Sequence, residues 1–320
     1  QLAHPDYELI PDGSDVDSAV EGFAGKYLPV YPASAKLPSW KISQCAQLAI
    51  GALDEIADFL PEIIRAKHDY PSLHQALVQL HQPADLDHAE NARERLTFDE
   101  AFLLQSLLVL RRIELKKLNS TSRKATAGGL LDAFDKRLPF QLTAGQVAVC
   151  KEIEADLAQP HPMHRLLQGE VGSGKTIVAL RAMLAVVDSG GQAALLAPTE
   201  VLAAQHLRTI QKLLGDLSLG GMLGGSEVAT QITLITGSQN AAARKEALAL
   251  AASGDAGIVI GTHALLGEKV AFKDLGLIVV DEQHRFGVEQ RDALKEKAVL
   301  PPHLLVMTAT PIPRTVAMTV

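Results

Sequence analysis

Short apolar runs recur through the second half of the chain and are separated by longer helical or loop stretches. They are rich in Leu, Val, Ile and Ala, which is typical of strands buried on both faces of a parallel sheet. The segments expected to be strands are 165–168, 193–197, 232–236, 258–261, 277–280 and 304–308. Because these runs alternate with helices, residues 130–320 are predicted to form an α/β domain whose parallel sheet is covered by helices on both faces.

The stretch before this domain has a helical period instead. Apolar residues recur at helical spacing in segments 47–59 and 72–80 and after residue 100. Thr97 and Glu100 have the spacing of a capping box, so we expect a helix to begin there. Residues 41–129 are therefore predicted to be a helical linker region that ends in a polar, Gly-containing linker at 120–129.

The first 40 residues are rich in Pro, Gly and Asp, which prevents a long helix. Short apolar runs such as 27–31 suggest irregular strands, and the segment is too short to form a domain alone. The chain begins at Gln1 without an initiator Met and stops at Val320 within an apolar run. We therefore expect a piece of a longer protein.

Composition narrows the classes of protein. Hydrophobic residues make up 47% and charged residues 21%, which favours packed cores over disorder. Cys45 and Cys150 lie far apart, which argues against a disulfide framework or zinc site and favours a reducing cytoplasm. No signal peptide or membrane span is visible. The net charge of −7 argues against a generally basic surface and leaves a local basic track open.

The strongest chemical signal is a phosphate-loop pattern between an apolar strand and an apolar helix. Its glycines let the backbone curl so that successive N–H groups face a polyphosphate, and the helix N-terminus adds a positive dipole end. Lys175 would neutralise the β- and γ-phosphates, and the Thr176 hydroxyl would ligate Mg²⁺. The residues expected to bind ATP here are Gly169, Glu170, Val171, Gly172, Ser173, Gly174, Lys175 and Thr176.

A second signal is a pair of carboxylates, Asp281 and Glu282, directly after the apolar strand at 277–280. Ligands of parallel sheets bind at the carboxyl ends of the strands. Asp281 would hold the Mg²⁺ shell, and Glu282 would orient and polarise the attacking water. His284 would couple the γ-phosphate to neighbouring elements, or it is a structural histidine with satisfied hydrogen bonds.

Residues 138–146 precede another helix, for which Thr143 is the expected N-cap. Phe140 has the chemistry to stack on adenine, and the Gln146 amide offers both a donor and an acceptor for the base edge. A capped helix start without any further role fits these residues equally well.

Three more loops follow predicted strands. Small hydroxyl residues at the end of the last strand would bond to the carboxylate loop and relay the nucleotide state. Two other loops carry hydroxyls and helix N-termini that suit the phosphates of a nucleic-acid strand, although they are also ordinary strand-to-helix connections. The residues concerned are Thr308, Ala309 and Thr310, then Pro198, Thr199 and Glu200, then Gly261, Thr262 and His263.

These motifs in this order resemble superfamily 2 helicases, and in particular the RecG family of ATP-dependent DNA helicases. The segments that carry the resemblance are 169–176, 281–291 and 307–315, with weaker likeness at 4–9, 29–32 and 93–100. The resemblance implies the end of an OB-like DNA-binding wedge domain at 1–40, linking helices at 41–129, and a first RecA-like domain at 130–320. Transcription-repair coupling factors share much of the pattern but usually carry Glu-Gln at positions 283–284.

The resemblance also implies an activity and partners. The parent protein would remodel stalled replication forks and Holliday junctions in recombination and repair, as a cytoplasmic, nucleoid-associated monomer. Its partners would be branched DNA and a second RecA-like domain, with no membrane. That domain supplies an arginine worth about 10³–10⁵ in rate, so we expect this chain alone to bind nucleotide weakly and hydrolyse it poorly. A non-catalytic nucleic-acid-binding module and a small-molecule kinase are the alternatives, and the intact Lys175, Asp281 and Glu282 argue against the former.

Overall fold

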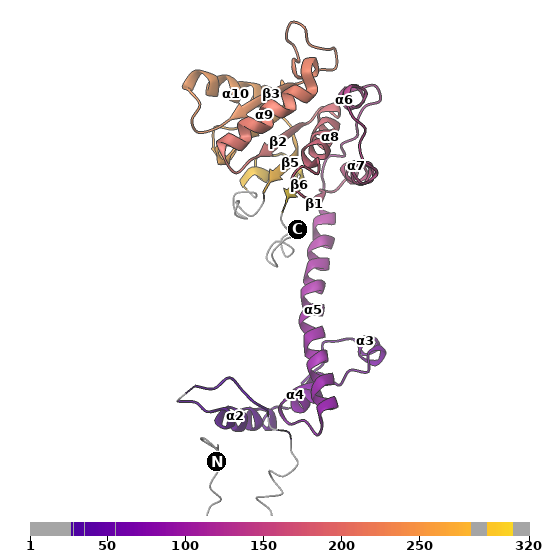
Figure 1. The fold of residues 1–320 in the computed structure, drawn as a ribbon, viewed down its shortest axis with the longest axis vertical. Coiled ribbons are helices and arrows are strands. Elements are labelled where there is room, and N and C mark those ends of the chain that lie inside the picture. Colours follow the sequence, from indigo (N-terminus) through magenta and orange to yellow (C-terminus); the bar gives the residue numbers. More distant parts are fainter. Residues whose placement is uncertain (1–26, 28, 35, 55, 283–292, 310–320) are drawn as a thin grey trace, which may run out of the picture. The chain divides into compact units, whose positions relative to one another are not determined.

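The chain folds as two compact units, residues 1–109 and 110–320, divided within a single long helix (Figure 1). The computed structural model describes residue 27 and residues 29–34, 36–54, 56–282 and 293–309. Most of the segment 1–40 lies outside the described residues, and the run expected to be an irregular strand at 27–31 forms no strand at its described residues, 27 and 29–31.

The described part of the first unit is helical. It contains α2 (Ser39–Gly51), α3 (Glu62–Lys67), α4 (Leu73–His81) and the greater part of α5 (Leu86–Lys117). At its centre the Arg95 guanidinium is buried and donates to Asp58 at 2.7 Å and to Asp99 at 2.8 Å. A charge without exposure needs such partners, so this ion network fixes the packing of α5 against the loop that carries Asp58.

Two of the helix boundaries predicted from the sequence are wrong. Thr97 is not an N-cap, because it lies inside α5 and its hydroxyl donates to the carbonyl of Arg93 at 2.9 Å. No Gly or Pro interrupts the chain between Leu86 and Lys117, so the helix runs through the local capping pattern. The helix expected at 47–59 ends at Gly51, and Asp58 instead accepts from the backbone of Leu60 and Leu73. The helix predicted at 72–80 is confirmed, with Ser72 as its N-cap.

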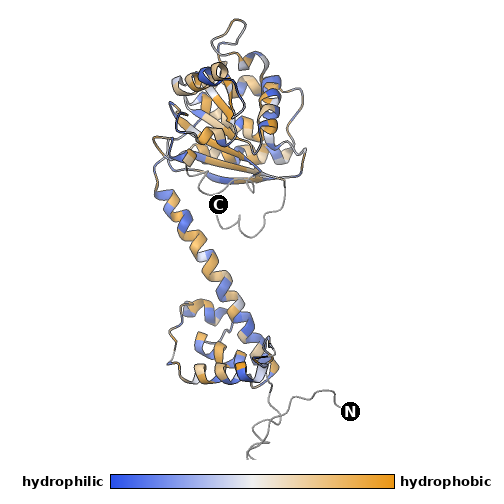
Figure 2. Cartoon of the chain, turned by 90° about the vertical axis from the view of Figure 1, so that its left-hand side faces the viewer, coloured by the Kyte–Doolittle hydropathy of each residue, from blue (hydrophilic) through white to orange (hydrophobic). Residues whose placement is uncertain are grey.

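The second unit contains a six-stranded parallel sheet with the order β1-β6-β5-β2-β4-β3. The strands are β1 (His164–Gln168), β2 (Gln192–Leu196), β3 (Gln231–Ile235), β4 (Ala256–Gly261), β5 (Leu275–Asp281) and β6 (His303–Thr308). Each matches a predicted strand to within one or two residues, which confirms the predicted α/β parallel-sheet fold. Figure 2 shows how strongly the strands favour hydrophobic residues.

Helices cover both faces of this sheet (Figure 1). Alternate residues of β2 enter two different cores: Ala193 and Leu195 pack in one, Ala194 and Leu196 in the other. The first core contains α6 (Leu130–Arg137), α7 (Ala144–Leu157), α8 (Lys175–Asp188) and α9 (Glu200–Leu214). The second contains α10 (Ala241–Ser253) and the short helix η2 (His263–Leu266). A further short helix, η1 (Gly215–Ser218), follows α9.

The polar segment 120–129 has no helix or strand, as its composition predicts, but it is bound to the sheet unit. Ser120 and Arg123 donate their backbone N–H groups to Pro160 and Leu157, at 2.9 and 2.7 Å. The buried Arg123 side chain also pairs with Asp274. The domain boundaries at residues 40 and 129 stay a prediction. None of the helices in the described ranges is both long and apolar enough to cross a membrane.

Candidate nucleotide-binding site

Three of the predicted motifs meet at the carboxyl end of β6. This strand lies between β1 and β5 in the sheet. The backbone N–H of Gly169, after β1, donates to the Thr308 carbonyl at 3.3 Å. The N–H of Glu282, after β5, donates to the Met307 carbonyl at 3.0 Å. The phosphate loop and the carboxylate loop are thus tied to adjacent residues of one strand, and Thr308 is buried between them.

The phosphate loop has the backbone geometry that its glycines predict. Gly172 and Gly174 adopt positive φ angles of +85° and +84°, a region that residues with a Cβ rarely adopt. Gly174 is the N-cap of α8, so the helix begins at Lys175 and its N-terminus faces the loop. The Lys175 ammonium donates to the carbonyls of Gly169 and Glu170, at 2.7 and 2.9 Å. This lysine is therefore positioned within the curl of the loop, where a polyphosphate would bind.

Gln146 joins the phosphate loop to α7. Thr143 is the N-cap of α7, as predicted, and its hydroxyl accepts from the Gln146 backbone at 3.2 Å. The Gln146 side chain accepts from the Thr143 backbone and donates to the Ser173 carbonyl, both at 2.9 Å. The side-chain oxygen of Gln146 can accept one further hydrogen bond, and its NH2 group can donate one further hydrogen bond. The reading of a base edge by Gln146 stays a prediction, whereas its contact with the loop is observed.

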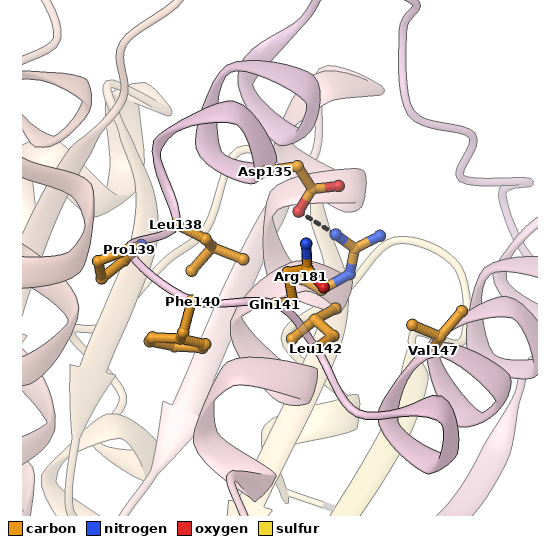
Figure 3. Close-up of a pocket in the computed structure, with 8 residues that line it drawn as sticks. All are labelled: Asp135, Leu138, Pro139, Phe140, Gln141, Leu142, Val147 and Arg181. Carbon is orange, nitrogen blue, oxygen red and sulfur yellow. Dashed lines mark hydrogen bonds and ion pairs between the residues drawn. The ribbon is translucent and has the colours of Figure 1, made fainter.

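A cavity of about 590 Å³ contains Phe140 in its wall, and Val147, the residue after Gln146, also lines it. Its volume is within the range of small-molecule sites. Phe140 is 44% exposed, and Arg181 of α8 pairs with Asp135 across the cavity (Figure 3). The lining residues are Asp135, Leu138, Pro139, Phe140, Gln141, Leu142, Val147 and Arg181. The apolar wall and the polar pair suit a flat heteroaromatic ring.

The two carboxylates at the end of β5, Asp281 and Glu282, differ in their surroundings. Asp281 belongs to the alternate positions of β5 that face α8 and α9, together with Leu277 and Val279. Its side chain is only 15% exposed and accepts from His206 Nε2 of α9 at 2.7 Å. Glu282 adopts a φ of +52°, which is uncommon for a residue with a side chain, and such conformations cluster at functional sites.

His206 was not predicted from the sequence as a site residue. A signal for it exists, because it lies in the core-facing stripe of α9 that also contains Ala203, Leu207, Ile210 and Leu214. A polar residue within such a stripe needs a hydrogen-bonding partner. The identity of that partner, Asp281, depends on the tertiary fold.

The site fits a nucleotide-borne Mg²⁺ better than an ion held by protein alone. No cluster of three or more potential metal-ligating side chains occurs among the residues that the structure describes. Mg²⁺ usually keeps several waters and is bound through one or two carboxylates together with phosphates. Asp281, with one carboxylate oxygen bound by His206, and the half-buried Thr176 at the start of α8 meet that description.

The loops after β2, β3 and β4 form a second group at the same edge of the sheet. Thr199 is the N-cap of α9, and its neighbour Glu200 accepts from the backbone of Gly237 at 2.8 Å and of Ser238 at 3.1 Å. The Ser238 hydroxyl also donates to this carboxylate, which lowers the pKa of Glu200. Gly237 and Ser238 were not predicted, since nothing in their local sequence points to Glu200.

Close packing and a hydrogen bond also fix the predicted loop after β4. A Cβ at Gly261 would lie 2.3 Å from the Ile235 carbonyl, so the close approach of β3 and β4 requires glycine there. The buried Thr262 hydroxyl accepts from the Ala264 backbone, and His263 is exposed at the surface. Pro198 lies in the loop before Thr199, and Ala309 follows Thr308. His284 and Thr310 lie outside the described residues.

The fold and the site together define a P-loop helicase motor domain. The model of the DEAD/DEAH box helicase family matches residues 143–319, which is more than half of the chain. The chain belongs to the DEAD/DEAH box helicase family.

Within that family its similarity is to the RecG helicases. It is 51% identical, over its whole length, to the ATP-dependent DNA helicase RecG of Mycobacterium tuberculosis, and 42% identical over 99% of its length to RecG of Synechocystis. A solved structure of RecG bound to a three-way DNA junction matches 91% of the chain, with a TM-score of 0.71 and 34% identity. The chain spans 46% and 37% of these two relatives and 38% of the solved chain.

Proposed function

We propose that this chain is the ATP-binding part of an ATP-dependent DNA helicase that acts on branched DNA, in recombination and repair. The observation that carries the proposal is the arrangement at β6. There the phosphate loop and the carboxylate loop are hydrogen-bonded to the adjacent residues Thr308 and Met307. The whole-chain similarity to helicases named RecG, one of which was solved with a three-way junction, supports the choice of substrate.

ATP hydrolysis is proposed to proceed by attack of water on the γ-phosphate. Lys175 neutralises the β- and γ-phosphates from within the loop, and Thr176 with Asp281 binds the Mg²⁺ that accompanies ATP. The metal, when bound, would offset the negative charge that develops on the phosphate oxygens. Glu282 orients the water and accepts its proton, and His284 links the γ-phosphate to neighbouring elements.

The adenine base is proposed to lie in the cavity beside Phe140. Its ring would stack on the exposed Phe140 face, since aromatic pairs prefer offset stacking. Gln146 would use its remaining donor and acceptor on the base edge while it keeps its bond to Ser173. The base and the phosphates would then be read by two parts of the molecule that contact each other.

DNA is proposed to bind along the second group of loops. Backbone N–H groups, hydroxyls and helix N-termini are common partners of nucleic-acid phosphates. Residues Thr308, Ala309 and Thr310 would relay the nucleotide state between the two groups. The residues proposed to contact DNA or couple to it are Pro198, Thr199, Glu200, Gly261, Thr262 and His263.

Further partners belong to the same proposal. A second RecA-like domain of the same protein would close the ATP site, and the protein would act as a monomer in the cytoplasm near the nucleoid. The similarity to RecG favours branched DNA over the RNA polymerase on which a transcription-repair translocase acts.

The test uses the full-length protein and a labelled three-way DNA junction. Lys175→Ala is expected to abolish ATP-dependent unwinding, because the loop loses the cation that binds the β- and γ-phosphates. Lys245→Ala, an exposed lysine on α10, is the matched control and should unwind at the wild-type rate. Unwinding by Lys175→Ala at the rate of the control would overturn the assignment.

A further inference from the structure

We propose that His206 is a positioning residue for the Asp281 carboxylate and thereby sets the Mg²⁺ dependence of nucleotide binding. The inference rests on the ATP site proposed above and adds to it a residue from α9. His206 lies 75 residues from Asp281 in the sequence, and the fold brings the two together.

The geometry is that of a directed hydrogen bond between two largely buried groups. His206 Nε2 lies 2.7 Å from Asp281 Oδ2, and the two side chains are 13% and 15% exposed. Among the described residues, His206 provides the only hydrogen bond to this carboxylate. A carboxylate oxygen accepts, so the imidazole donates from Nε2. Oδ2 is thereby fixed, and Oδ1 keeps its lone pairs for another ligand.

The position of His206 on α9 indicates that its hydrogen bond to Asp281 does more than support packing. Ala203 and Ile210, three residues before it and four after it, are fully buried on the same stripe. An apolar side chain would fill this position without a polar group to satisfy, whereas a buried imidazole is costly unless it is hydrogen-bonded. An apolar residue here would only pack, whereas His206 also fixes the direction of the Asp281 carboxylate.

Control of direction matters because Mg²⁺ demands nearly ideal octahedral geometry. Residues that orient a metal ligand from outside the coordination shell typically change metal affinity or activity by about 10–100-fold when they are lost. The same helix begins with Thr199 as its N-cap and with Glu200, which binds the loop after β3. His206 lies six residues further on, about 9 Å along the helix axis. One rigid element thus contacts both groups of loops.

The test measures binding of ATPγS to the full-length protein by calorimetry, once with saturating Mg²⁺ and once with EDTA. Wild type is expected to bind more tightly with Mg²⁺. His206→Leu, which keeps the volume and removes the donor, should lose about tenfold or more of that tightening, with unchanged affinity in EDTA. His206→Gln keeps an N–H donor at a similar reach and should restore most of the Mg²⁺ effect.

A matched control is His88→Leu, which removes a histidine that also lies 2.7 Å from an aspartate, Asp85, but on an exposed helix surface. It should bind like wild type under both conditions. Equal affinity of His206→Leu and wild type with Mg²⁺, or an equal loss in Mg²⁺ and in EDTA, would overturn the role of His206. If wild type itself fails to bind ATPγS with Mg²⁺, the proposed ATP site is wrong instead.

Discussion

The two groups of loops at the edge of the sheet are held in different ways. Around β6, the loops after β1 and β5 are attached by backbone hydrogen bonds to Thr308 and Met307. Around β4, the Glu200 side chain holds the loop after β3 through Gly237 and Ser238. The first arrangement fixes the backbone and leaves Glu282 at a positive φ beside Asp281. The second arrangement uses the Glu200 carboxylate to hold a loop in place.

This difference fits the ligands proposed for the two sides. A site for a triphosphate and Mg²⁺ needs its charged side chains for chemistry, so the backbone must hold the loops. A surface for a DNA strand benefits from exposed N–H groups and hydroxyls, and an acidic side chain there is better engaged with the loop than facing the phosphates. Substitutions on the two sides should therefore affect different steps.

The largest effect is expected at Glu282 on the nucleotide side. Glu282→Gln keeps the size of the side chain and removes the proton acceptor, so hydrolysis should fall by about 10²–10⁴-fold while ATP still binds. Single-turnover hydrolysis by the full-length protein, together with an ATP-binding titration, measures both. Glu227→Gln, in an exposed loop after η1, is the control. Hydrolysis by Glu282→Gln within threefold of wild type would contradict the assigned role.

A smaller effect is expected at Glu200 on the other side. Glu200→Ala removes the bonds to Gly237 and Ser238, and should weaken junction binding by about fivefold, because the loop after β3 loses the side chain that holds it. Junction affinity should change more than ATP affinity. Fluorescence anisotropy with a labelled junction checks this, with Glu246→Ala on α10 as the control. A larger loss of ATP affinity than of DNA affinity would remove the distinction between the two sides.

The Glu200 interaction also has a defined pH dependence. Its pKa lies below the usual value of 4.5, chiefly because it accepts a hydrogen bond from the Ser238 hydroxyl. A lowered pKa means that the interaction is complete at neutral pH and is lost as the pH falls through the folded-state value. The DNA-side loops should therefore keep their structure throughout the neutral range.

The sequence predicted the sheet well because its strands are buried on both faces. Runs such as 277–280 are apolar at every position, as strands buried on both faces usually are, and their short length separates them from the apolar runs of the longer helix α8. The phosphate loop could be predicted equally well, since glycine permits the positive φ angles that Gly172 and Gly174 adopt.

At Thr97 the helix α5 continues through a local capping pattern because no Gly or Pro interrupts it. The other failures share one cause, which is that tertiary contacts override local patterns. Segment 47–59 has helical spacing, but Asp58 is needed by the buried Arg95. His206 is visible in the sequence only as a polar residue in an apolar stripe, and its partner is known only from the fold. The same is true of Gly237 and Ser238.

The central claim is that one edge of the sheet has a nucleotide side and a DNA side, and backbone amide exchange of the full-length protein tests it most directly. Mg²⁺ with ATPγS should slow exchange at residues 169–176 and 281–282. A three-way junction without nucleotide should slow it at residues 199–200, 237–238 and 262–263. Protection of residues 169–176 by the junction alone, with none from the nucleotide, would contradict the account.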